Sequence, residues 1–248
     1  MWTWFFRLAS PPTAYATAAR LRPWFLWPAM ALMLYAAYSA LFEVPPDYLQ
    51  KDAARIMYVH VPAAALSMAV YMAMAVAAAV GLIWRIKLAH ALAAACAPIG
   101  AWFTVLALIT GAVWGRPMWG TWWAWGDPRI IFTTLTLFLY FGYMALRASF
   151  DDLQRADRAS AVLAIVGSVN VPVVKYSVDW WNSLHQTASI LKFGKPSIDA
   201  SMLTPMYIML LAFALYFVAV ACDRLNAEIL RRERNASWLK EMLSGVAR

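Results

Sequence analysis

Apolar residues in this chain are grouped into six long runs that alternate with short polar connections. We place these runs near residues 23–42, 60–84, 92–114, 130–148, 160–178 and 202–222. Each run is about 18 to 25 residues long, which is the length at which an α-helix crosses the roughly 30 Å hydrocarbon layer of a bilayer. The pattern therefore predicts an all-α integral membrane protein with six transmembrane helices.

Composition supports a membrane protein without a soluble domain. Of the 248 residues, 63% are hydrophobic and only 14% are charged, whereas a soluble domain carries about a quarter charged residues. We therefore interpret residues 1–248 as a single membrane domain that ends in a polar tail, residues 223–248. The first 22 residues combine arginines with Trp2, Trp4, Phe5 and Phe6, a pattern typical of an interfacial helix on the membrane surface.

The basic residues favour one orientation of the six helices. If the N-terminus is cytoplasmic, the inner segments hold fourteen of the 21 Lys and Arg residues, and the outer loops hold seven. Because short cytoplasmic loops carry an excess of Lys and Arg, we expect both termini to be cytoplasmic. The net charge of +8 then reflects membrane topology and contact with lipid, and it gives no reason to expect nucleic acid as a partner.

Tryptophan is concentrated in one outer segment. Five of the fourteen tryptophans lie between positions 114 and 125, in and just before the loop 115–129: Trp114, Trp119, Trp122, Trp123 and Trp125. Tryptophans at a membrane surface are commonly anchors of an interfacial belt. The alternative is an aromatic platform that binds a ligand, because this run holds far more tryptophans than an even distribution along the chain would place there.

The chain has three histidines, and their places differ. His60 precedes Val61-Pro62, where the chain enters the membrane from the outside, and proline is favoured in the first turn of a helix. His185 lies in the last outer loop. His90 lies near Arg85 and Lys87 on the inner side, and we interpret it as a solvated loop residue.

Two histidines and a tryptophan cluster on one side of the membrane favour haem over a bare metal ion. Imidazole is a common ligand of iron. A haem site combines an axial ligand for the iron with a large apolar surface around the porphyrin. Structural zinc usually takes four protein ligands and catalytic zinc three. The haem propionates would attract cations, and the same outer layer holds Arg55, Arg116 and Arg129. Asp127 either pairs locally with Arg129 or positions it.

The fifth apolar run contains Asn170 and, two residues later, Pro172. An amide in hydrocarbon needs a hydrogen-bond partner, and proline removes a backbone bond and bends a helix. The bend is either a tolerated kink or a device that directs Lys175 and Tyr176 over a cavity.

Three segments of the sequence resemble a known family. The segment Trp119-Gly120-Thr-Trp122-Trp123-Ala-Trp125-Gly-Asp127-Pro-Arg129 resembles the signature of the WWD family of haem-handling membrane proteins. Tyr58-Val-His60-Val-Pro-Ala-Ala and Val171-Pro-Val-Val-Lys-Tyr-Ser-Val-Asp-Trp-Trp-Asn-Ser-Leu-His185-Gln narrow the resemblance. Together they are similar to cytochrome c maturation protein C, the haem exporter protein C family, over nearly the whole chain.

The resemblance implies a place and a role for the protein. Family members sit in the bacterial inner membrane with the WWD loop on the periplasmic side. They hold haem b, as a transferred ligand, between two histidines that match His60 and His185. They deliver it to a haem chaperone, cytochrome c maturation protein E, and work with the ABC-transporter subunits A and B and the small protein D. The resemblance implies a haem-handling protein rather than an enzyme.

The sequence departs from the family pattern at one point. The family signature usually ends in Trp-Asp-x-Arg, whereas Trp125-Gly126-Asp127-Pro128-Arg129 has one residue more. The added residue would shift Asp127 and Arg129 relative to the tryptophans, although the freedom of a glycine could compensate for it.

Two other classes of protein remain as alternatives. A transmembrane transporter of haem or another solute needs polar groups near the membrane centre or broken helices, and only the Asn170–Pro172 segment offers these. A membrane redox enzyme with b-type haems needs pairs of histidines inside the helices, whereas His60 and His185 are expected at the outer surface.

Overall fold

The structure is a computed structural model that describes residues 10–187, 190, 192 and 194–244. Within this part of the chain, six helical segments are long and apolar enough to cross a membrane, which confirms the prediction of an all-α membrane protein. The main helices are α2 (Pro11–Tyr38), α3 (Met57–Trp84), α4 (Lys87–Trp119), α5 (Pro128–Ala148), α6 (Leu153–Gly167), α7 (Asn170–Trp180) and α8 (Ala200–Arg232). Shorter elements are η1 (Ser39–Glu43), η2 (Asp52–Ile56) and α9 (Ser237–Leu243).

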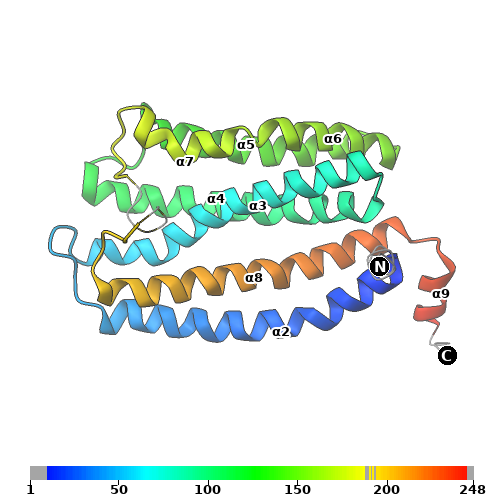
Figure 1. The fold of residues 1–248 in the computed structure, drawn as a ribbon, viewed down its shortest axis with the longest axis horizontal. Coiled ribbons are helices and arrows are strands. Elements are labelled where there is room, and N and C mark those ends of the chain that lie inside the picture. The colour runs from blue at the N-terminus through cyan, green and yellow to red at the C-terminus, as the bar shows by residue number, and fades with distance from the viewer. Residues whose placement is uncertain (1–9, 188–189, 191, 193, 245–248) are drawn as a thin grey trace.

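The helices lie in three layers, which Figure 1 shows from the side. Helices α2 and α8 run side by side along one face, the pair α3 and α4 forms the middle, and α5, α6 and α7 cover the opposite face. One end of the bundle carries η2, the connection 120–127 and the described residues of the connection between α7 and α8. We call it the aromatic end, because it holds the tryptophan-rich loop.

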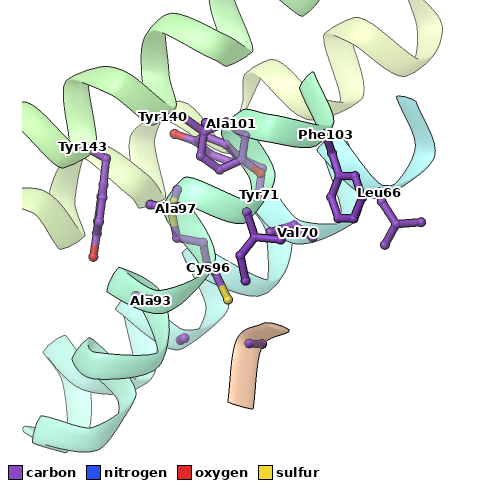
Figure 2. Packing of buried hydrophobic residues seen from close by; sticks show 14 of the residues in the cluster. Leu66, Val70, Tyr71, Ala93, Cys96, Ala97, Ala101, Phe103, Tyr140 and Tyr143 are labelled. Carbon is purple, nitrogen blue, oxygen red and sulfur yellow. The ribbon is translucent and has the colours of Figure 1, made fainter. Parts of the chain in front are cut away.

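Small residues allow the middle layer to pack closely. Buried alanines are frequent on α3 and α4, and small interface residues let helices approach each other in lipid. Figure 2 shows the aromatic centre of this core, where the rings of Tyr71 and Tyr140 meet edge to face with centroids 4.9 Å apart. The Tyr140 hydroxyl donates to the Ser67 carbonyl at 2.8 Å. This bond ties α5 to α3 in the buried core.

The first helix differs from the sequence prediction. Residues 11–22, expected to belong to a separate interfacial helix, continue without a break into the first apolar run as α2. Pro11 and Pro12 occupy the first helical positions, where their missing N–H groups cost nothing. Residues 1–9, with Trp2, Trp4, Phe5 and Phe6, lie outside the described residues.

The prediction that His90 is a solvated loop residue was wrong. His90 lies in the first turn of α4 and is only 9% exposed. Its ring lies so close to Gly81 of α3 that a Cβ there would come within 2.8 Å of the ring carbons. The short α3–α4 connection allows helix to begin at Lys87, and this buries His90 between two helices.

The fifth predicted helix is broken where Asn170 was noted. Helix α6 ends at Gly167 and α7 begins at Asn170. The Asn170 amide donates to the Phe132 carbonyl and to the Thr136 hydroxyl of α5, both at 2.9 Å. The side-chain amide at the break therefore finds its hydrogen-bond partners on a neighbouring helix, as a polar group in a membrane interior requires.

The end of the bundle opposite to the aromatic end is held by buried ion pairs, and we call it the basic end. Arg232 of α8 makes two bonds of 2.8 Å to Asp157 of α6. Arg147 of α5 contacts both Asp157 and Glu228. These four side chains are each at most 13% exposed, and they join the consecutive helices α5 and α6 to α8, which follows much later in the chain.

Candidate functional site

The aromatic end brings together residues from the start of α3, the end of α4 and the connection after α7. His60 is the fourth residue of α3, which follows directly on η2. Trp114 and Trp119 lie in the last turns of α4, and His185 lies in the connection after α7. Gly120 ends α4 with a φ of 75°, in the left-handed region that glycine adopts readily, and the tryptophan-rich loop turns away from the helix there.

His60 is held by its neighbours on α4. Its Nδ1 atom lies 3.1 Å from the Thr110 hydroxyl. Its ring meets Trp114 edge to face, with centroids 5.6 Å apart. Trp114 in turn donates through Nε1 to the Gln50 side chain at 2.9 Å. The histidine is thus fixed between two helices and backed by an aromatic wall.

His185 is held by Asp127. The Nδ1 atom of His185 lies 3.0 Å from Asp127 Oδ1, and the ring meets Trp119 edge to face at 4.7 Å. Asp127 is only 4% exposed. It caps α5 by accepting from the Ile130 N–H at 3.2 Å, and it accepts from the Ser183 hydroxyl at 2.7 Å and the Leu184 N–H at 2.8 Å. One carboxylate therefore orders the start of α5 and the loop that carries His185.

The environment sets the charge of this pair. Burial opposes ionisation of Asp127, but the hydrogen bond from Ser183, the nearby His185 and two backbone N–H groups outweigh it, so that its pKa lies below the ordinary value. Burial lowers the pKa of His185, although the Asp127 carboxylate acts in the opposite direction. At neutral pH the site therefore presents an ionised carboxylate and a neutral imidazole, which is the form that binds metals.

Two adjoining cavities open between these residues. The larger has a volume of about 380 Å³, and the smaller has a volume of about 90 Å³. Both are lined by His60, His185, Trp119 and Arg129. The larger falls within the roughly 300–1,000 Å³ typical of small-molecule sites. The two histidines, one in the first turn of α3 and one in the connection after α7, thus line a common space of ligand size.

The tryptophans take different places around this space. Trp114 and Trp119 line the larger cavity, while Trp119, Trp122 and Trp123 line the smaller one. Trp125 lines neither cavity and is 81% exposed, with its ring 5.8 Å from that of Trp123. The dense run is therefore divided between cavity wall and outer surface.

The three arginines selected from the sequence also differ in what they contact. Arg129 lines both cavities and donates to the Lys175 carbonyl at 3.1 Å, while its Nε atom is buried without a hydrogen-bond partner among the described residues. Arg55 pairs with Asp52 at 2.9 Å and donates to the Ala40 carbonyl. Arg116 donates to the Gly120 carbonyl. Neither Arg55 nor Arg116 lines either cavity.

Several residues of the site were not selected from the sequence. Thr110 and Gln50 support His60 and Trp114, and Ser183 supports Asp127. Ser183 could have been noticed, since it lies two residues before His185. Thr110 and Gln50 carry no comparable signal, because their contacts join segments 50 and 64 positions apart.

The donor set of this site does not suit a bare metal ion. Among the described residues, no group of three or more His, Cys, Asp or Glu side chains is placed to hold one. Two imidazoles across an aromatic cavity can instead supply the two axial positions of an iron whose other four ligands come from a porphyrin.

Comparison with known proteins places the chain in a family. The family model described as Heme exporter protein C matches residues 4–240. Heme exporter protein C of Bradyrhizobium diazoefficiens is 46% identical over 91% of this chain and 85% of its own length. The protein of the same name from Haemophilus influenzae is 42% identical over 98% of both chains. A mitochondrial relative from Marchantia polymorpha, named for cytochrome c biosynthesis, is 43% identical over 73% of this chain and 76% of its own.

The range matched by the family model, residues 4–240, covers all six membrane-spanning segments and the connections between them. The similarity therefore extends over the whole architecture that builds the cavity, and the chain belongs to the heme exporter protein C family.

Proposed function

We propose that this protein binds haem b in the cavity of the aromatic end and passes it to a periplasmic haem chaperone, cytochrome c maturation protein E. The observation that carries the proposal is the common cavity lined by His60 and His185, each with Nδ1 engaged in a hydrogen bond. When Nδ1 carries the proton and donates it in this hydrogen bond, Nε2 carries the lone pair that can bind iron. The names of the relatives, which refer to heme export and cytochrome c biosynthesis, support the same role.

The tryptophans would supply the apolar surface around the porphyrin ring. The cavities are lined by Trp114 and Trp119 at the end of α4 and by Trp122 and Trp123 of the tryptophan-rich loop. Flat aromatic side chains bury large areas and favour offset or edge contacts with other rings. Trp125 is exposed at the rim, where a chaperone that collects the haem would approach.

Of the three arginines selected from the sequence, Arg129 is the one that the cavities offer to a propionate. Its Nε atom is a buried donor with no hydrogen-bond partner among the described residues, and a buried guanidinium donor without a partner is costly. A carboxylate entering the cavity would satisfy it. Arg55 and Arg116 would first have to release their present bonds to Asp52, Ala40 and Gly120. We therefore assign the propionate contact to Arg129 before the other two.

The proposed orientation puts the aromatic end on the periplasmic side of the bacterial inner membrane. It rests on the excess of Lys and Arg in the connections of the opposite end. Haem held there would be exposed to a periplasmic acceptor, with the ABC-transporter subunits A and B and the small protein D as partners. The two cavities that the histidines line both lie at this end, which favours presentation of haem over its conduction across the bilayer.

The visible absorption spectrum of the purified protein tests the proposal. We expect the wild-type protein to show the spectrum of a bis-histidine haem, and the spectrum to be lost or shifted in both His60→Ala and His185→Ala. His90→Gln is the matched control, because His90 is the third histidine and lies between α3 and α4 at the other end of the bundle. Identical spectra in all four proteins would refute the two axial ligands.

Transfer is tested separately from binding. Haem-loaded protein is mixed with the apo-chaperone, and covalent loading of the chaperone is followed by haem staining after denaturation. We expect His60→Ala with His185→Ala to abolish loading. Normal loading by this double variant would contradict the proposed role in delivery.

A further inference from the structure

The two candidate axial ligands are supported by different chemical groups. His60 meets the Thr110 hydroxyl through Nδ1 at 3.1 Å. Thr110 itself donates to the Leu106 carbonyl at 2.7 Å, so its proton is already engaged within α4. The Thr110 oxygen therefore accepts from Nδ1–H of His60. The partner behind His60 is a neutral oxygen.

The partner behind His185 is a carboxylate. Asp127 Oδ1 lies 3.0 Å from His185 Nδ1, and the carboxylate is almost completely buried. It cannot move away easily, because it also accepts from Ile130, Ser183 and Leu184. Ser183 and Leu184 precede His185 directly in the chain. The same carboxylate thus holds the ring and the backbone that carries the ring.

This difference changes the two imidazoles as ligands. A carboxylate that accepts from the far nitrogen of a metal-bound histidine fixes its orientation and raises its basicity. A charged acceptor makes a stronger hydrogen bond than a neutral hydroxyl does. If both histidines bind haem iron as proposed above, His185 is the stronger donor of the two.

We infer that Asp127 is a positioning residue that makes His185 the anchoring ligand and leaves His60 as the exchangeable one. During transfer the bond between iron and His60 breaks first, and its electron pair stays on Nε2 of His60. The vacated position accepts the electron pair of an incoming nitrogen donor. The iron keeps its oxidation state, and His185 holds the haem until the new bond has formed.

The location of the two residues alone would suggest the opposite order. His60 lies on a long helix, whereas His185 lies in a loop, and a loop ligand would be the more mobile one. The hydrogen bonds from Ser183 and Leu184 to Asp127 remove that difference, because they tie the loop to the start of α5. The edge-to-face contact of Trp119 with His185, at 4.7 Å, is also closer than that of Trp114 with His60, at 5.6 Å.

Carbon monoxide is the probe for this inference. It binds ferrous haem by replacing the weaker axial ligand, and the Fe–C and C–O stretching frequencies report how strongly the remaining histidine donates. Full-length, haem-loaded wild-type protein, Asp127→Asn and Thr110→Val are compared by resonance Raman spectroscopy. We expect Asp127→Asn to shift both frequencies to values typical of a neutral imidazole, and Thr110→Val to leave them unchanged. A shift in Thr110→Val alone would overturn the inference.

A second comparison does not depend on how well Asp127→Asn folds. The carbon monoxide adduct of wild-type protein is compared with those of His60→Ala and His185→Ala. We expect the wild-type frequencies to match His60→Ala, because His60 is the ligand that leaves. A match to His185→Ala would overturn the inference while leaving the haem site in place. A wild-type protein that takes up no haem would instead contradict the proposed function itself.

Haem affinity gives the magnitude of the effect. Loss of a partner behind a metal ligand typically lowers affinity by about 10- to 100-fold. We expect a decrease of that order for Asp127→Asn, accompanied by a rise in the reduction potential, because a less basic ligand stabilises ferric iron less. An unchanged potential in Asp127→Asn would contradict the assigned role, since a purely structural contact would leave the potential unaltered.

Discussion

Trp119 and Trp125 differ in what their side chains contact. Trp119 lines both cavities and touches His185, whereas Trp125 is 81% exposed. We expect Trp119→Ala to lower haem affinity about tenfold, since one aromatic contact is worth roughly 0.5–1.5 kcal/mol and 1.4 kcal/mol is a factor of ten. Trp125→Ala, the matched control, should change affinity by less than about threefold. Haem titration followed by absorbance measures both. Equal losses would mean that the run acts as one uniform surface.

At the scale of single residues, the sequence could predict the candidate ligands but not their supports. His60 and His185 were recognisable because histidine is rare in this chain and both were expected on the outer side of the membrane. Asp127 was expected either to pair with Arg129 or to position it, yet its hydrogen bonds go to His185 and to the two residues before it. Such contacts depend on how the loops meet in space, and no spacing along the chain encodes that.

Gly100 of α4 is needed for the contact between α4 and α5. A Cβ at this position would come within 2.0 Å of the Tyr140 hydroxyl, which donates to Ser67 in the buried core. We expect Gly100→Ala to displace Tyr140 and to cost about 1–3 kcal/mol through overpacking. Gly142→Ala is the control, since its Cβ would meet Leu163 at an ordinary 3.5 Å. Thermal unfolding in detergent, followed by circular dichroism, should show a lower midpoint for Gly100→Ala only.

At the scale of helices, the apolar runs predicted their number and order better than their ends. The third run was placed at 92–114, while α4 spans Lys87–Trp119. An apolar run reports the part of a helix that lies in hydrocarbon, and a helix can continue into the polar region on either side. Such continuation is what buries His90 and brings Trp119 against His185.

At the scale of the whole molecule, the ion pairs of the basic end join α5 and α6 on one face to α8 on the other. Asp157 is 7% exposed and binds both Arg147 and Arg232. We expect Asp157→Asn to destabilise the protein by about 3–5 kcal/mol, because it leaves buried arginines with an incomplete partner. Asp223→Asn breaks the pair with Arg22, whose side chains are 44% and 49% exposed, and should cost less than about 1 kcal/mol. If the unfolding curves of the two variants in detergent coincide, the buried ion pairs stabilise the protein no more than the exposed pair does.

The orientation of the whole molecule can be tested by chemical labelling. After Cys96 and Cys222 are replaced by serine, a single cysteine is placed at Gly126, where an added Cβ meets nothing within 4 Å, or at the exposed Asn235. We expect a membrane-impermeant maleimide, added to cells with a permeabilised outer membrane, to label Gly126→Cys, because the excess of Lys and Arg keeps the opposite end inside. Asn235→Cys should react only after lysis. The reverse pattern would place the haem cavity on the cytoplasmic side and remove the basis for delivery to a periplasmic acceptor.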